Sequence, residues 1–234
     1  MRILLTNDDG IDADGLAALE RVCEPLASEI IVVAPAEPAS QVGHRVTTHE
    51  PLHLSEHHSG RRYAVHGSPA DCVRVALKDL LAERPPDWVV SGINHGGNLG
   101  RHDIYISGTV AAAREAAFHG IPAVAVSHFL RSEFPLDWPV AEARARRALE
   151  SLLEERLGDG ELWNINLPHL PLGAPEPEIR HCEPERQPLE VRFQRETESG
   201  PLHYTGRYHH RPHNGESDVA VCFGGDIAVS RLCL

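Results

Sequence analysis

Short apolar runs recur along the first 170 residues, and amphipathic segments separate most of them. Five runs rich in Ile, Val or Leu cover residues 2–6, 29–34, 88–93, 121–127 and 162–167. Runs of this length and composition predict strands that are buried on both faces, as they are in a parallel sheet.

The segments between these runs carry helix signals. Residues 16–26 place Leu and Val at helical spacing, and residues 109–119 are rich in Ala and end before Gly120. The sequence Ser-Pro-Ala-Asp of residues 68–71 predicts a capping box with proline in the first turn. A further helix is expected over residues 139–157. Alternating strands and helices predict an α/β fold with a doubly wound, mostly parallel sheet.

Two regions break this alternation. Residues from about 45 to 66 contain short alternating segments, which predict a β-hairpin insertion in an α/β core of residues 1–170. Residues 171–234 are rich in Pro, His, Arg and Glu and contain few large apolar side chains. We therefore expect a β-rich C-terminal appendage or exchange arm and not an independently folded domain.

Composition and charge restrict the possible partners. The chain has 234 residues, 41% of them hydrophobic, and a net charge of −12, so we expect a globular protein for which neither nucleic acid nor an anionic membrane is the primary partner. No apolar stretch is long enough for a transmembrane helix, and the first apolar run is too short for a signal peptide. The five cysteines form no Cys-x-x-Cys pair, which favours reduced thiols in a cytoplasmic protein.

Polar residues follow three of the predicted strands. Asp8 and Asp9 follow the first strand, Ser40 lies after the second, and Asn94 follows the strand of residues 88–93. The carboxyl ends of parallel strands meet at one rim of the sheet, where ligands bind. These side chains would form an all-oxygen ligand set suited to Mg²⁺ or Mn²⁺. A simple turn that caps the next helix remains an alternative interpretation of residues 7–10.

Two further segments at this rim suit a phosphate group. Residues 96–100, Gly-Gly-Asn-Leu-Gly, form a loop with accessible backbone N–H groups, and Ser107, Gly108 and Thr109 open a predicted helix. An ordinary N-cap is the alternative for the second segment. The sequence lacks the dinucleotide fingerprint, the P-loop and the serine hydrolase elbow.

Histidine is abundant, with 16 residues. His44 and His95 lie near the predicted rim and are candidates for substrate contact. His209, His210 and His213 stand in a polar stretch without convincing zinc spacing, so we expect them on a solvated arm.

Several segments together resemble the SurE (survival protein E) family of metal-dependent nucleotidases. The matching segments are RILLTNDDG (residues 2–10), VHGSPADCV (65–73), PDWVVSGINHGGNLG (86–100), YISGTVAAAREAAFHGIPAVAV (105–126), NINLP (164–168) and SDVAVCFGGDIAVS (217–230). The resemblance implies a Rossmann-like core and a 5'-nucleotidase that hydrolyses nucleoside 5'-monophosphates, and possibly 3'-monophosphates, to nucleoside and phosphate. It also implies homodimers or homotetramers formed through an exchanged C-terminal arm.

The resemblance also assigns roles to residues. It implies one divalent cation per subunit, Mg²⁺ or Mn²⁺, with Asp8, Asp9, Ser40 and Asn94 as ligands. The catalytic residues would be Asp8, Asp9 and Asn98. The phosphate-binding residues would be Gly97, Asn98, Ser107, Gly108 and Thr109. Two positions depart from the family pattern, since Ala39-Ser40-Gln41 replaces Arg-Ser-Gly and one extra residue precedes Ser107.

Two other functions fit the same residues: a non-catalytic nucleotide or metal sensor, and a metal-dependent amide hydrolase. Amide hydrolases of this kind add histidines beside the carboxylate pair, whereas Asn7 and Gly10 flank it here. The net charge of −12 argues against long nucleic acids but not against a small phosphorylated substrate, because a cation, backbone amides and a helix end can hold one phosphate.

Overall fold

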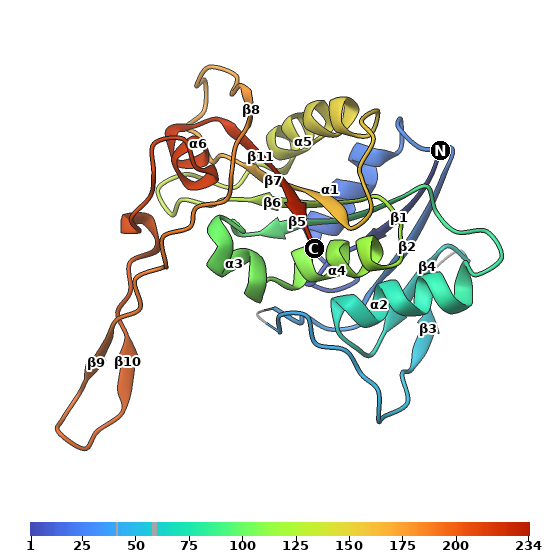
Figure 1. Cartoon of the computed structure of the whole chain (residues 1–234), viewed down its shortest axis with the longest axis horizontal. Helices are drawn as coiled ribbons and strands as arrows, with labels where there is room; N and C mark the ends of the chain where they lie inside the picture. The colour runs from blue at the N-terminus through green and yellow to red at the C-terminus, as the bar shows by residue number, and fades with distance from the viewer. Residues whose placement is uncertain (41, 58–59) are drawn as a thin grey trace.

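A computed structural model describes residues 1–40, 42–57 and 60–234 of the chain (Figure 1). The strands are β1 (Arg2–Thr6), β2 (Glu29–Pro35), β3 (Leu54–Glu56), β4 (Arg62–Val65), β5 (Trp88–His95), β6 (Ala123–His128), β7 (Glu161–Leu167), β8 (Ile179–His181), β9 (Phe193–Arg195), β10 (Leu202–Tyr204) and β11 (Ile227–Cys233). The helices are α1 (Asp14–Cys23), α2 (Pro69–Val75), α3 (Gly100–Ile106), α4 (Gly108–Phe118), α5 (Trp138–Leu152) and α6 (Asp218–Gly224), with a π-helical turn η1 (Ala76–Leu80) and a 3₁₀ turn η2 (Tyr208–His210).

Nine strands form one sheet in the order β3-β4-β2-β1-β5-β6-β7-β11-β8, and β9 and β10 form a separate two-stranded sheet. The six strands that neighbour one another in the order β4-β2-β1-β5-β6-β7 all run parallel. From β1 the chain winds outward to β2 and β4, and after β5 it winds the opposite way to β6 and β7. The predicted doubly wound, mostly parallel α/β fold is confirmed.

Helices cover both faces of this sheet, as Figure 1 shows. One buried cluster joins the sheet to α1 and α5 through side chains such as Leu16, Leu19 and Leu149. The other joins the opposite face to α2 and α4 through Val73, Val110 and others. The strands between the two layers are buried on both sides, which explains why the sequence shows continuous apolar runs there and no alternation.

The capping box predicted from the sequence is confirmed, and the predicted helix bounds are approximately correct. Ser68 and Asp71 form a reciprocal capping box at the start of α2, and Pro69 occupies its first turn. Helix α5 begins at Trp138, one residue before the predicted start, but ends at Leu152 instead of 157. Every helix within the described ranges is too short or too polar to cross a lipid bilayer.

The C-terminal region differs from a simple appendage. Strand β11 pairs antiparallel with β7 over six residues, and β8 pairs parallel with β11, so both extend the main sheet. The proposed division at residue 170 thus leaves two strands of the sheet outside the core of residues 1–170. The β9–β10 hairpin stands away from the body of the protein (Figure 1). Within residues 45–66, β3 and β4 pair antiparallel, while residues 58 and 59 lie outside the described residues.

Candidate active site

The direction of winding reverses between β1 and β5, which are neighbours at the centre of the sheet. Asp8 and Asp9 follow the end of β1, and Asn94 is the second-last residue of β5. In doubly wound sheets, ligands bind outside the carboxyl ends of the strands at this point of reversal. The topology therefore places three of the predicted ligand residues at the expected position.

Asp8 packs directly against the first turn of α4. The Thr109 hydroxyl donates a hydrogen bond of 2.5 Å to Asp8 Oδ1. A Cβ atom placed on Gly108 would lie 2.7 Å from Asp8 Cβ and 2.9 Å from Asp8 Oδ2. Only a residue without a side chain allows this close approach. The structure thus brings the predicted metal ligand and the predicted phosphate segment together.

The pKa of the Asp8 carboxyl group is raised from 3.8 to about 6: burial and, less strongly, the charge of Asp9 raise it, and the hydrogen bond from Thr109 partly offsets them. Two adjacent carboxylates with one of them buried form a site that a cation would stabilise.

Backbone hydrogen bonds place the other two predicted ligands nearby. The Ala39 amide donates to the Asp8 carbonyl at 2.7 Å, which brings the neighbouring residue Ser40 to the end of β1. The His95 amide donates to Asp9 Oδ2 at 3.1 Å. The Asn94 side-chain amide donates to the Gly96 carbonyl at 2.7 Å, so the side-chain oxygen of Asn94 points away from that bond.

These residues fit a hard cation through oxygen atoms alone. Within the described ranges, no three His, Cys, Asp or Glu side chains gather in a way that could hold a metal ion. A set of two carboxylates, one hydroxyl and one amide oxygen suits Mg²⁺ or Mn²⁺ better than zinc.

The N-terminus of α4 supplies backbone donors beside Asp8. Ser107 is the N-cap, and its hydroxyl accepts from the Val110 amide at 3.1 Å, while its carbonyl accepts from the Ala111 amide at 3.1 Å. The backbone amides of Gly108 and Thr109 come before Val110 in the first turn of α4, where a helix leaves its N–H groups without intrahelical partners. They can hold an anion at the positive end of the helix dipole.

Asn98 is hydrogen-bonded through its side chain to strand β6 and not to Asp8 or Asp9. It is 7% exposed, and its side-chain amide donates to Ser127 Oγ of β6 at 2.8 Å. Its backbone amide donates to Asn166 Oδ1 at 2.8 Å, and its carbonyl accepts from the side-chain amides of Asn164 and Asn166, both at 3.0 Å. These contacts hold the glycine-rich loop against β6 and β7.

Sequence reasoning gave no role to Asn164 and Asn166. They are two residues apart on β7, so both side chains lie on the same face of the strand. Both are at most 1% exposed, and a pair of buried amides in an apolar strand requires hydrogen-bond partners. That alternation of Asn within an apolar run was the available signal for a loop-binding role.

In the part of the chain that the structure describes, the side chains of the two candidate histidines form no hydrogen bond with Asp8 or Asp9. His44 Nε2 lies 2.7 Å from Glu115 Oε2 of α4, and Glu115 also faces His119 and Arg74 at 3.3 and 3.7 Å. Burial acts to raise the pKa of Glu115, but these neighbours outweigh it and the net pKa is lowered. His95 contributes its backbone to Asp9, while its side chain is exposed.

The two departures from the family pattern lie in the chain after β2 and in the stretch that includes α3. Gln41 is outside the described residues. The extra residue before Ser107 falls in the last turn of α3, where the Ile106 carbonyl accepts from the Gly43 amide at 3.1 Å. The end of α3 therefore contacts Gly43.

Comparisons with known proteins identify related sequences and a related fold. The family model of survival protein SurE matches residues 3–190. A protein of Nostoc sp. is 44% identical over 232 residues, which are 99% of this chain and 99% of that protein. The 5'-nucleotidase SurE of Desulforamulus reducens is 46% identical over 173 residues, covering 72% of this chain and 67% of that protein. The crystal structure of the SurE protein from Aquifex aeolicus is similar with a TM-score of 0.87 and 30% identity, over 100% of this chain and 93% of that chain.

Proposed function

The chain belongs to the survival protein SurE family, and on that premise we propose that it is a metal-dependent 5'-nucleotidase, which hydrolyses nucleoside 5'-monophosphates to nucleoside and phosphate. The observation that carries this proposal is the contact between the carboxylate of Asp8 and the first turn of α4 at the point where the sheet reverses its winding. This contact supplies a cation-binding and an anion-binding group side by side, as a phosphate ester bound through a cation requires.

The proposed cation site consists of Asp8, Asp9, Ser40 and Asn94, and holds one Mg²⁺ or Mn²⁺ ion per subunit. When bound, such an ion would polarise a phosphate oxygen and lower the pKa of a water molecule. Thr109 fixes Asp8 through its hydroxyl, and the His95 amide fixes Asp9. Both carboxylates are thus held by hydrogen bonds before any ligand arrives, which favours a preorganised site.

The protein's own groups perform the remaining steps of the proposed reaction. Asp9, or Asp8, orients the attacking water and accepts its proton. The amides of Gly108 and Thr109 donate to the non-bridging phosphate oxygens, whose charge is stabilised as the ester bond breaks. Asn98 holds the glycine-rich loop, so that the amide of Gly97 can face the same phosphate.

A substitution and metal removal test this proposal. Asp9→Asn removes one negative charge from the site while keeping its size, and we expect phosphate release from adenosine 5'-monophosphate to fall by about 100-fold or more. A chelator should abolish the activity, and added Mn²⁺ or Mg²⁺ should restore it. Asp12→Asn is the matched control, because Asp12 has a side chain 77% exposed and lies outside the site.

Full activity of both the Asp9→Asn variant and the chelated protein would contradict metal-dependent hydrolysis. Binding of adenosine 5'-monophosphate without any phosphate release would favour the sensor instead. Phosphate release in the presence of Mn²⁺ excludes both the sensor and an amide hydrolase that does not cleave phosphate esters.

We further infer a homodimer or homotetramer formed through the C-terminal arm. The β9–β10 hairpin extends from the body in Figure 1 and exposes more than half of each of four apolar side chains: Val191, Phe193, Leu202 and Tyr204. Exposed apolar groups on a projecting hairpin favour burial against another subunit. Replacing Phe193 and Tyr204 by Glu should lower the molar mass measured by light scattering, and an unchanged mass would contradict the inference.

We also place the protein in the cytoplasm. All five cysteines are free thiols in the structure, and three of them, Cys23, Cys72 and Cys222, are buried. Thiols that remain unpaired suit a reducing compartment. Fractionation of cells that produce the protein tests this location, and recovery outside the cytoplasmic fraction would contradict it.

A further inference from the structure

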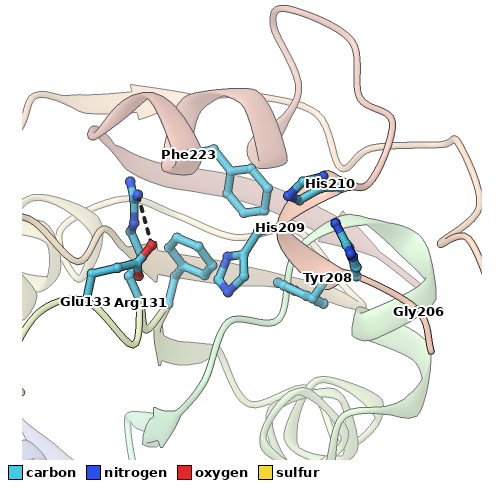
Figure 2. Close-up of a pocket in the computed structure, with 9 residues that line it drawn as sticks. Arg131, Glu133, Gly206, Tyr208, His209, His210 and Phe223 are labelled. Carbon is cyan, nitrogen blue, oxygen red and sulfur yellow. Dashed lines mark ion pairs between the residues drawn. The ribbon is translucent and has the colours of Figure 1, made fainter. Parts of the chain in front are cut away.

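A cavity of about 590 Å³ lies beyond the end of β6, outside the proposed cation and phosphate site. Its lining comes from three separate segments: the chain after β6, the chain around η2, and α6 (Figure 2). The nine lining residues are Phe129, Arg131, Glu133, Gly206, Arg207, Tyr208, His209, His210 and Phe223. A cavity of this size is in the range that small ligands occupy.

The cavity adjoins the proposed reaction site across the glycine-rich loop. Asn94 of β5 lies opposite Ser127 of β6, so Phe129, two residues farther along, starts about 8 Å from Asn94 by strand geometry. The Gly96 amide donates to the His128 carbonyl at 3.0 Å, and a Cβ atom on Gly97 would lie 3.4 Å from Phe129 Cβ. A substrate with its phosphate at the rim could therefore extend over this loop into the cavity.

The wall of the cavity is aromatic. Phe129 and Phe223 are stacked with ring centres 4.7 Å apart, and His209 meets Phe129 edge-on at 5.4 Å. The Tyr208 ring is held by a hydrogen bond of 2.6 Å from its hydroxyl to Asp103 Oδ2. Phe, Trp and Tyr make up only 5% of the chain, so this gathering of rings is a local feature. Ring faces bind flat π systems such as nucleobases.

The polar groups around the rings are mostly positively charged or able to donate hydrogen bonds. Arg131, Arg207 and two histidines line the cavity, whereas Glu133 is its one acidic lining residue and pairs with Arg131 at 3.5 Å (Figure 2). This local balance is opposite to the net charge of −12 of the whole chain. It suits the ring nitrogens and carbonyl oxygens of a base attached to an anionic phosphate ester, and it disfavours a cationic ligand.

We propose that this cavity is the base-binding subsite of the enzyme, in which the nucleobase of the substrate stacks on the His209 ring and meets the perpendicular Tyr208 ring edge-on, while its phosphate lies beside Asp8 and Thr109. This inference rests on the proposed function, because it takes the position of the phosphate from it. The opposite side of the rim, after β2, is less suited. There His44 is already bound to Glu115 at 2.7 Å, and its ring contacts Phe118 with centres 5.6 Å apart.

The test compares two phosphate esters that differ by the base. We measure kcat/KM for adenosine 5'-monophosphate and for ribose 5-phosphate, and take their ratio. Loss of one base-stacking contact should lower this ratio at least about fivefold in His209→Ala, mainly through the KM for the nucleotide. His209→Phe keeps a ring at the position and should restore most of the ratio.

Two control variants test whether the effect is specific to the cavity. His203→Ala removes an exposed histidine of the same arm that does not line the cavity, and its kinetics should equal those of the unmodified protein. Arg45→Ala changes the exposed segment after β2 and should leave the ratio unchanged.

Three outcomes would overturn the proposal. An unchanged ratio in His209→Ala, with both esters still hydrolysed, would refute the base subsite and leave the proposed function intact. A lowered ratio in Arg45→Ala alone would place the base on the β2 side. Absence of phosphate release from either ester in the unmodified protein would refute the proposed function and this subsite with it.

Discussion

At the scale of single residues, the site depends on one close contact. Gly108 and Thr109 both touch Asp8, one through the lack of a side chain and the other through a hydroxyl. The sequence indicated that Asp8 and Thr109 belong to one rim, because each occupies a strand end or a helix start. It gave no distance between them, since residues 8 and 109 come together only through the packing of α4 on the sheet.

Gly108→Ala should therefore reduce activity strongly. The added Cβ would lie 2.7 Å from Asp8 Cβ, so Asp8 or the helix must move, and a displacement of this kind lowers kcat by about 100-fold. Gly224→Ala in α6 is the matched control, because nothing lies within 4 Å of the added atom. We expect the control to keep full activity and a slightly raised melting temperature. Equal activity of both variants would show that the contact is unimportant.

At the scale of secondary-structure elements, strand β7 positions a loop that it does not adjoin in sequence. Asn164 and Asn166 project from β7 to the backbone of Asn98, which lies two strands away along the sheet. The side chains are short and rigid, so the loop position follows from the register of β7. The apolar pattern predicted the strand, but its register against β6 was decided by tertiary packing.

Asn166→Leu tests this positioning role. It removes the acceptor for the Asn98 amide and one of the two donors to the Asn98 carbonyl, and we expect a loss of about 1–3 kcal/mol of unfolding free energy. We also expect a lower kcat, because the loop loses its fixed position. Asn164→Leu removes only one donor and should have the smaller effect in urea unfolding and in activity assays. The reverse order would contradict the assignment.

Helix α2 is attached to the chain after β2 through a buried carboxylate. Asp71 accepts hydrogen bonds from the Thr47 amide at 2.8 Å and hydroxyl at 2.9 Å, and from the Ser68 amide at 3.0 Å. Burial acts to raise the pKa of Asp71, but these donors outweigh it, and the net pKa lies below its usual value of 3.8. The contribution of Asp71 to stability is thus fully present above pH 3.8 and is lost as the pH falls through the lower, folded-state pKa.

Asp71→Asn should accordingly destabilise the protein by about 1–3 kcal/mol at pH 7. The difference from the unmodified protein should shrink as the pH is lowered below 3.8, since the native carboxylate then becomes protonated as well. Urea unfolding between pH 7 and pH 3 measures both effects. Asp79→Asn, at an exposed position of η1, should follow the unmodified protein throughout. A difference that stays constant with pH would contradict this role of the charge.

At the scale of the whole molecule, a buried ion pair joins the C-terminal arm to the body. Arg211 Nη1 lies 2.7 Å from Asp103 Oδ2 of α3, and the two side chains are 1% and 8% exposed. Asp218 of α6 accepts from the Gly100 amide at 2.7 Å and from the Glu185 amide at 2.8 Å. The arm therefore contacts the helix that follows the glycine-rich loop, and its position affects the cavity after β6.

Breaking this pair on one side should be costly. Asp103→Leu leaves the Arg211 charge buried, and we expect a loss of about 3–5 kcal/mol together with faster proteolysis of residues 186–210. Adding Arg211→Met to Asp103→Leu removes the uncompensated charge and should recover most of the stability. Urea unfolding and limited proteolysis of the three proteins measure these effects. A double variant as unstable as the single one would contradict this explanation.

The sequence by itself determined the strands from β1 to β7, the capping box of α2 and the residue types at the rim. These features depend on local patterns: apolar runs, capping residues, and polar residues placed directly after strands. The predicted metal and phosphate residues follow from the same patterns and from the family resemblance.

Tertiary structure alone decided how β8 and β11 join the main sheet, how Asn98 faces β6 and β7, and how Phe129, Tyr208, His209 and Phe223 meet around one cavity. Each of these contacts joins residues far apart in the chain. Pairing between distant segments depends on the complementarity of surfaces that form only once the sheet and its helices have packed, and no local pattern of side chains records it.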